Sequence, residues 1–204
     1  MSVNAKQRRA APLSADERRK SIVSAVIPLL LEQGAAVTTK QMADAAGVAE
    51  GTIFGVFDDK AALVYEAVRS SLDPAPVQAA LSHIHVGAPI DVQMAEAARI
   101  LLERYETVIA LFSVLRSFPG PHEASHASGP PDFVVEANTA INQSLTHMFE
   151  MHRPFLRIEP SKAAVAFRSL VFASRHSALT GHDRLSVQDI VAVLTAGIME
   201  PVSV

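Results

Sequence analysis

Residues 37–60 have the pattern of two short helices that meet at a tight glycine turn. The first is predicted to begin at Thr39, whose hydroxyl can cap it, and to end at Gly47, because glycine readily adopts the left-handed conformation of a helix end. The second is predicted at about Glu50–Phe54, with Val48 filling the angle between the two. Apolar residues at helical spacing give the pair a buried side: Met42, Ala43, Ala46, Ile53 and Phe57.

Two helices joined in this way form a helix-turn-helix, the unit that lays its second helix in the major groove of DNA. The spacing around the turn resembles that of the TetR/AcrR family of bacterial transcriptional regulators. The resemblance is carried by Gly34, Thr38, Thr39, Met42, Ala43, Ala46, Gly47, Val48, Gly51, Thr52, Ile53, Phe54, Phe57, Lys60 and Leu63. It implies an all-α protein with an N-terminal three-helix DNA-binding domain and a larger C-terminal helical domain for ligand binding and dimerisation.

The composition favours closely packed helices. Apolar residues make up 49% of the 204 residues, aromatic residues only 5%, and there is no Trp, so Ala, Leu and Val must form the core. The absence of Cys excludes disulfides, thiolate metal sites and Cys nucleophiles. The sequence shows neither a signal peptide nor an apolar run that spans a membrane, so we expect a cytoplasmic protein with no membrane partner.

Charge is distributed unevenly along the chain. The net charge is −3, yet residues 1–72 hold nine basic and eight acidic side chains, whereas residues 73–204 hold nine basic and thirteen acidic ones. The basic residues cluster near the N-terminus. Beside a helix-turn-helix, we interpret residues 1–13 as a basic arm whose Arg8 and Arg9 contact DNA; a solvated tail without contacts is the alternative.

The DNA-binding domain is predicted to span residues 14–72. Its first helix begins at Ser14 with the spacing of a capping box. After the helix-turn-helix, a fourth helix is predicted at about 60–72, with Asp59 or Asp58 as its cap.

The effector-binding and dimerisation domain is predicted at residues 73–204, beginning where prolines break the fourth helix. All eight His residues lie in this domain. Its helices are predicted at Pro89–Ser117, as two helices meeting near Glu106–Ile109, at Asp132–Met151, and at Ser161–Ser177 and Ser186–Met199, the last two with Ser caps.

Helix starts present free N–H groups that bind phosphate, and the start of the second motif helix faces base edges. Thr39 and Lys60 are predicted to hold phosphates, and Thr52 to lie near the bases; the alternative is that Gly51 and Thr52 only begin the helix. The complete set of predicted DNA contacts is Arg8, Arg9, Thr38, Thr39, Lys40, Ala49, Glu50, Gly51, Thr52, Phe54 and Lys60.

Three positions depart from the family pattern, each toward weaker phosphate contact. Phe54 lacks the hydroxyl of the usual Tyr, Val56 stands where a basic or polar residue is common, and Glu50 is acidic where Lys is frequent. Modest affinity for DNA is then expected unless the arm compensates; alternatively, Glu50 accepts a hydrogen bond from a cytosine amino group.

The resemblance further implies that the C-terminal helices sense a small molecule and that the last two pair in a homodimer, which reads a palindromic double-stranded operator, usually to repress. Apolar character favours a hydrophobic or aromatic effector, with a Tyr and a His as polar anchors. The candidate ligand-binding residues, for which a plain core role is the alternative, are Ile100, Leu101, Tyr105, Ile109, Phe112, Leu115, His147 and Met148. The pairing faces, shared in part with the core, are Ala163, Ala166, Phe167, Leu170, Val171, Ala173, Ile190, Val193, Leu194, Ala196 and Gly197.

Other classes of function fit the sequence less well. It has no His-Glu-x-x-His, no phosphate-binding Gly-Lys-Ser/Thr loop and no Gly-x-Ser-x-Gly, so we expect neither an enzyme nor a cofactor. A metal-sensing regulator would use His122, His126, His83 or His85, and we assign no metal site. A structural nucleoid protein would need more positive charge than the first 72 residues carry.

Overall fold

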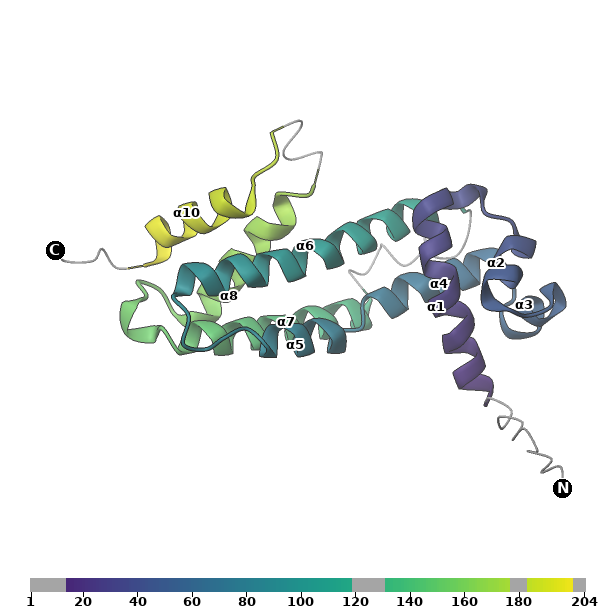
Figure 1. The fold of residues 1–204 in the computed structure, drawn as a ribbon, viewed down its shortest axis with the longest axis horizontal. Coiled ribbons are helices and arrows are strands. Elements are labelled where there is room, and N and C mark those ends of the chain that lie inside the picture. The colour runs from purple at the N-terminus through teal and green to yellow at the C-terminus, as the bar shows by residue number, and fades with distance from the viewer. Residues whose placement is uncertain (1–13, 119–130, 177–182, 200–204) are drawn as a thin grey trace, which may run out of the picture. The chain divides into compact units, whose positions relative to one another are not determined.

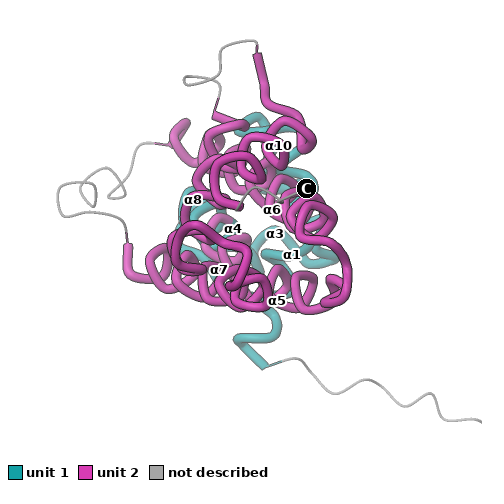
Figure 2. Tube along the Cα trace, turned by 90° about the vertical axis from the view of Figure 1, so that its left-hand side faces the viewer, with its two compact units in different colours: residues 1–67 teal, residues 68–204 magenta. Residues whose placement is uncertain are grey.

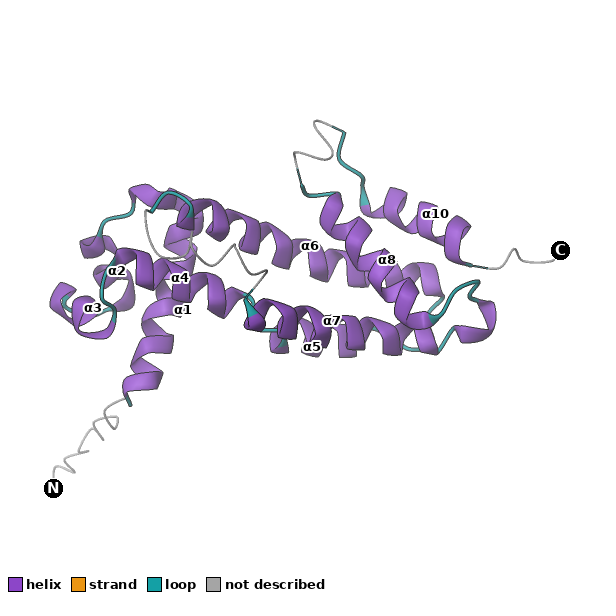
Figure 3. Ribbon diagram, turned by 180° about the vertical axis from the view of Figure 1, so that it is seen from behind, coloured by secondary structure: helices purple, strands orange, loops and turns teal. Residues whose placement is uncertain are grey.

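The computed structural model describes residues 14–118, 131–176 and 183–199. Within these ranges the chain is built of helices, and Figure 3 shows no strand there. The predicted all-α fold is therefore confirmed. Among the same residues, no helix is long and apolar enough to cross a membrane.

The chain divides into two compact units, residues 1–67 and 68–204 (Figure 2). The division falls inside helix α4, Lys60–Ser71, whereas the sequence predicts a boundary after residue 72, where that helix has ended. Neither Gly nor Pro interrupts α4, so the helix runs through the boundary unbroken. The predicted boundary lies at the end of α4, whereas the two compact units are divided by the contacts between residues, which change after Ala67.

The first unit is formed by α1, α2, α3 and the beginning of α4 (Figure 1). The bounds are α1 Ala15–Gln33, the short 3-10 helix η1 Gly34–Ala36, α2 Thr39–Ala46 and α3 Glu50–Val56. α1 packs against both α2 and α3, so one core fixes both motif helices. That core consists of Ile22, Val23, Val26, Leu30, Val37, Met42, Ala43, Ile53, Phe57, Leu63, Val64 and Ala67.

Two of the predicted helix caps in this unit are confirmed. Ser14 Oγ accepts the N–H of Glu17 at 3.2 Å while Glu17 Oε2 accepts the N–H of Ser14 at 2.8 Å, which completes the capping box of α1. Asp59 Oδ1 accepts the N–H of Ala62 at 2.7 Å at the start of α4.

The cap of α2 is Thr38, so the prediction of Thr39 is wrong. Thr38 Oγ1 accepts the N–H of Gln41 at 3.2 Å, and Gln41 Oε1 accepts the N–H of Thr38 at 2.8 Å. Only Thr38 has a Gln three positions later; Thr39 has Met42, which cannot complete a capping box.

The second unit contains the helices that follow α4. Their bounds are α5 Ala75–Ser82, α6 Ile90–Leu115, α7 Asp132–Glu150, the 3-10 helix η3 Arg153–Phe155, α8 Pro160–Ala173 and α10 Val187–Ile198. α7 packs chiefly against α8, and α6 packs against α5, α8 and α10.

Two elements in this unit differ from the prediction. Pro74 and Pro76 do end α4, but they also lie at the start of α5, where a missing N–H costs nothing. α6 is a single helix through residues 106–109, where two helices are predicted to meet. Tyr105 and Val108 are both buried there, so packing outweighs the low helix propensity of the β-branched residues.

The starts of the last two helices also test the predicted caps. Ser186 caps α10 in a capping box with Asp189, as predicted. For α8 the N-cap is Glu159 and Pro160 is the first helical residue, so the predicted cap Ser161 lies inside the first turn.

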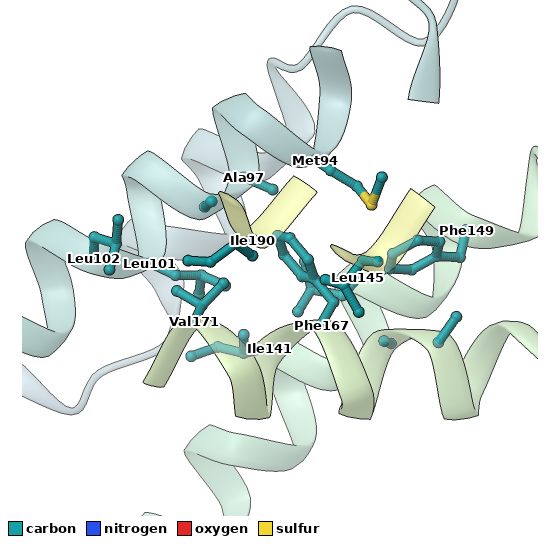
Figure 4. Close-up of a cluster of buried hydrophobic side chains, with 14 of the residues drawn as sticks. Met94, Ala97, Leu101, Leu102, Ile141, Leu145, Phe149, Phe167, Val171 and Ile190 are labelled. Atoms are coloured by element: carbon teal, nitrogen blue, oxygen red, sulfur yellow. The ribbon is translucent and has the colours of Figure 1, made fainter. Parts of the chain in front are cut away.

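The core of the second unit lies between α6, α7, α8 and α10. Phe149 and Phe167 meet edge to face with ring centroids 5.9 Å apart. Figure 4 shows these rings among Met94, Ala97, Leu101, Leu102, Ile141, Leu145, Val171 and Ile190.

Candidate functional site

The turn between α2 and α3 has the predicted geometry. Gly47 lies in the left-handed region, with φ 66° and ψ 31°. Its N–H donates to the Asp44 carbonyl at 3.1 Å, and the Val48 N–H donates to the Ala43 carbonyl at 3.0 Å, which are the two bonds of a Schellman C-cap. This cap ends α2 sharply, and half-buried Val48 leads the chain into α3.

α3 has one buried side and one side open to solvent. Ile53 is 1% exposed and Phe57, which follows the helix, is 2% exposed, whereas Phe54 is 54% exposed. No side chain caps the helix at Ala49, so its first N–H groups remain available to an outside acceptor. Of the predicted contacts around its start, Ala49, Glu50 and Gly51 are exposed and Thr52 is half-buried.

Arg19 of α1 holds the C-terminal end of α3, a role that the sequence reading does not assign to it. Its Nη1 donates to the Val56 carbonyl at 2.8 Å, and its guanidinium lies 4.4 Å from the centre of the Phe57 ring. Its Nη2 lies 3.7 Å from Glu66 Oε2 on α4. A cation suits a helix C-terminus, so Arg19 fixes α3 from the side opposite its exposed face.

Replacing Arg19 with alanine is expected to lower the free energy of unfolding by about 1–3 kcal/mol, because a hydrogen bond from a charged donor and a cation–π contact are lost. Urea unfolding followed by circular dichroism measures the change. Arg18→Ala is the matched control: Arg18 is exposed, and its loss should change stability by less than about 0.5 kcal/mol. Equal losses in the two variants would contradict the role of Arg19.

The start of α2 presents groups suited to a phosphate. The Thr38 hydroxyl is engaged in the capping box. The N–H groups of Thr39 and Lys40, by contrast, donate to no acceptor among the described residues. Thr39 is half-buried and Lys40 is exposed, so two amides and an ammonium are available at this helix start.

The Lys60 side chain forms a hydrogen bond within the first unit. Its Nζ donates to the Ala35 carbonyl at 2.8 Å, and its side chain is half-buried. Burial lowers the pKa of Lys60. A phosphate contact by this residue would compete with the bond to Ala35, so Lys40 is the more accessible of the two cations.

The candidate ligand-binding residues do not all lie inside the second unit. His147 is exposed, and its role in ligand binding stays a prediction. α7 buries every fourth residue, including Leu145 and Phe149, and position 147 falls on the opposite side. Of the others, Leu101, Tyr105 and Leu115 are buried, and Ile100, Ile109, Phe112 and Met148 are half-buried.

α8 and α10 divide their apolar residues between the core and the surface. Of the residues predicted to pair two copies, Ala163, Phe167, Val171, Ile190 and Leu194 are buried within this chain and serve its core, the alternative that the sequence leaves open. The outward faces are nevertheless apolar, since Val165 is 47%, Phe172 41% and Val193 57% exposed. Ala196 and Gly197 are exposed beside them, and Ala166, Leu170 and Ala173 are half-buried.

The residues that the structure describes give no support to the metal-sensing alternative. Among the described residues, no three His, Asp or Glu side chains gather in a way that would hold a metal ion. His83 Nδ1 lies 2.6 Å from the Ala79 carbonyl of its own helix. His122 and His126, like Arg8 and Arg9 of the arm, lie outside the described residues.

Several solved structures are similar to this chain in fold. A protein of Mesorhizobium loti MAFF303099 assigned to the TetR family of transcriptional regulators is 18% identical, with a TM-score of 0.65 over 93% of this chain and 100% of that one. A transcriptional regulator of Rhodococcus sp. RHA1 is 18% identical, with a TM-score of 0.59 over 88% and 97%. A TetR regulator of Streptomyces coelicolor is 17% identical, with a TM-score of 0.55 over 91% and 99%. A comparison with curated proteins found no match.

A family match covers the segment that contains the helix-turn-helix. Residues 22–67 match the bacterial regulatory proteins of the tetR family. Regulators of this family are DNA-binding transcriptional repressors and not enzymes. Because the matched segment carries the α2–α3 motif, residues 22–67 form a helix-turn-helix segment of the kind found in the bacterial regulatory proteins of the tetR family, and the described helices beyond it share the fold of solved regulators.

Proposed function

We propose that the protein represses transcription as a homodimer, which binds a palindromic operator through α2 and α3 and leaves it when a small effector binds the second unit. The observation that carries this proposal is the open side of α3, supported from behind by buried Ile53 and by Arg19. Because the buried side of α3 is packed against the rest of the first unit, its exposed side can enter the major groove without any movement of α3 within that unit.

The exposed side of α3 is suited to close approach. Gly51 and Gly55 lie one turn apart and are both exposed, so no side chain at either position keeps the helix backbone away from DNA. Phe54 lies beside them and can make an apolar contact, for example with a thymine methyl group. Glu50 remains the proposed acceptor for a cytosine amino group, and Thr52 the proposed hydroxyl contact.

Phosphate contacts are proposed at the start of α2 and in the arm. The amides of Thr39 and Lys40 and the Lys40 ammonium supply them on α2. Arg8 and Arg9 are proposed to add contacts that α3 itself lacks, because α3 carries no basic residue.

Dimerisation is proposed through the outward faces of α8 and α10. Val165, Phe172 and Val193 leave apolar area exposed there, and a second copy would cover it. A two-fold symmetric dimer also suits the recognition of a palindromic operator, since one helix-turn-helix contacts only a half-site.

Footprinting on fragments of the source genome tests the proposal. We expect protection of discrete sites with two-fold symmetry, by a species whose mass in solution is that of a dimer. Uniform coating of all fragments at the same salt concentration would overturn sequence-specific repression.

Two substitutions should separate base contact from phosphate contact. Thr52→Ala is expected to narrow the difference in binding free energy between operator and random DNA by up to about 1–3 kcal/mol, because a contact to a base edge is lost. Lys40→Ala should weaken binding to both DNAs alike and reduce the salt slope by about one. Fluorescence anisotropy titrations over a range of salt measure both effects. If Thr52→Ala weakens both DNAs equally, Thr52 contacts no base.

A further inference from the structure

Arg168 lies where α6, α7 and α8 of the second unit meet. Its Nη1 donates to Asn138 Oδ1 on α7 at 2.7 Å. One turn later on the same face of α8, Phe172 meets Tyr105 of α6 edge to face, with ring centroids 5.2 Å apart. Arg168 and Tyr105 are close enough for the Arg168 charge to act on the Tyr105 hydroxyl.

Three buried polar atoms at this junction lack a hydrogen bond of good geometry among the described residues. Tyr105 is 7% exposed, and its buried hydroxyl makes no hydrogen bond of good geometry among the described residues, although the Arg168 guanidinium lies close enough to interact with it. The other two atoms are Nε of Arg168 and Oδ1 of Asn142, which lies one turn from Asn138 on α7. A buried polar atom without a hydrogen-bond partner destabilises the folded protein, so three such atoms close together indicate that a further group binds here.

Arg168 also lacks an acidic partner. Within the described ranges, no carboxylate oxygen lies within 4.0 Å of its guanidinium, whereas Arg175, further along the chain, lies 3.3 Å from Glu106. Buried or half-buried charges are usually paired. The junction therefore holds a cation whose counter-charge the described chain does not supply.

We propose that Arg168 and Tyr105 bind the carboxylate of an amphipathic effector, whose apolar part lies against the core of the second unit. The inference rests on the proposed function, in which the second unit binds the effector, and it specifies the class of that effector as an organic acid. It narrows the hydrophobic or aromatic effector expected from the sequence.

The donors at the junction fit a carboxylate. A guanidinium donates only, and a carboxylate can accept from Arg168 Nε and from the Tyr105 hydroxyl at the same time. Burial raises the pKa of Tyr105 and outweighs the opposite effect of Arg168, so the phenol keeps the proton that it donates. Leu101, Ile141 and Val171 lie together in the adjacent core and offer the apolar contact (Figure 4).

Matched acids and alcohols test the proposal. Isothermal titration calorimetry, without DNA, compares decanoate with 1-decanol and 4-phenylbutyrate with 4-phenyl-1-butanol. For at least one pair, the acid should bind the wild-type protein about tenfold or more tightly than its alcohol, which corresponds to about 1.4 kcal/mol. Ordered water alone at the junction would give no such preference.

Three variants assign the preference to these residues. Arg168→Gln should abolish it, and Tyr105→Phe, which removes a single hydroxyl and leaves the ring in the core, should reduce it several-fold. Arg99→Gln is the control, because Arg99 is exposed on α6 and the same charge is removed. If Arg168→Gln does not fold, as judged by circular dichroism, the decision rests on Tyr105→Phe against Arg99→Gln.

The proposal is overturned if no acid binds the wild-type protein, if acid and alcohol bind equally, or if the variants keep the full preference. These outcomes are independent of operator binding, because no DNA is present. If footprinting shows no discrete protected site but the acids still bind with the expected preference, the proposed repression is overturned and the proposed carboxylate site is retained.

Discussion

Replacing Ile53 with aspartate is expected to unfold the DNA-binding unit and abolish DNA binding. Ile53 is 1% exposed in the core that α3 shares with α1 and α2. The substitution removes an apolar side chain and buries a carboxylate without a partner, two effects that together exceed about 4 kcal/mol. Thermal unfolding and the helical circular dichroism signal measure the loss of structure, and anisotropy with labelled DNA measures the loss of binding.

The neighbouring substitution Phe54→Asp is the matched control. It places the same carboxylate on the exposed side of the same helix, where Phe54 is 54% exposed. We expect an unchanged melting temperature and a loss of DNA binding, because the added charge would face phosphates. If Phe54→Asp keeps full affinity for DNA, the open side of α3 is not the surface that contacts it.

Replacing Phe167 with alanine is expected to lower the free energy of unfolding by about 3–5 kcal/mol. Phe167 is fully buried on α8 and packs edge to face with Phe149 of α7, so its loss leaves a cavity between the two helices. Urea unfolding measures the change. Phe155→Ala, at a position that is 61% exposed, should cost less than about 0.5 kcal/mol. Similar losses would contradict the central place of Phe167 in this core.

The DNA-binding unit could be predicted from the sequence because its signals are local. Gly47 has the left-handed conformation that a turn between two short helices requires, and Ser14 with Glu17 forms a capping box at the expected spacing. The error at α2 is equally local: of two adjacent threonines, Thr38 is the cap, because only Thr38 has a Gln in the third helical position.

The structural role of Arg19 is hard to identify from the sequence, because Arg19 lies within a run of basic residues. Within Arg18, Arg19 and Lys20, charge alone does not separate a solvated residue from one that holds another helix. The helical period does: Arg19 precedes buried Ile22 and Val23 by three and four positions and so lies on the same face. Its acceptor, the Val56 carbonyl, is a backbone group far along the chain, and no sequence pattern identifies it.

The second unit was less predictable because long-range packing decides it. Pro74 and Pro76 indicate a break, and nothing local shows that they also begin α5. His147 is an example of a residue type that invites a ligand role while its position on α7 faces solvent. That the hydroxyl of Tyr105 and Nε of Arg168 lack a hydrogen bond of good geometry emerges only when α6 and α8 are brought together.

The most direct test of the central claim, that α3 lies in the DNA groove, uses the absence of Cys from the chain. Gly55→Cys adds a single thiol on the exposed side of α3, where a Cβ meets no atom within 4 Å outside the helix backbone. An iron chelate attached to this thiol should cleave a footprinted operator at two positions related by its two-fold axis, whereas the wild-type protein, which cannot carry the chelate, should leave the DNA intact. Cleavage spread evenly along the fragment, or none in a complex that still binds, would contradict the placement of α3 in the groove.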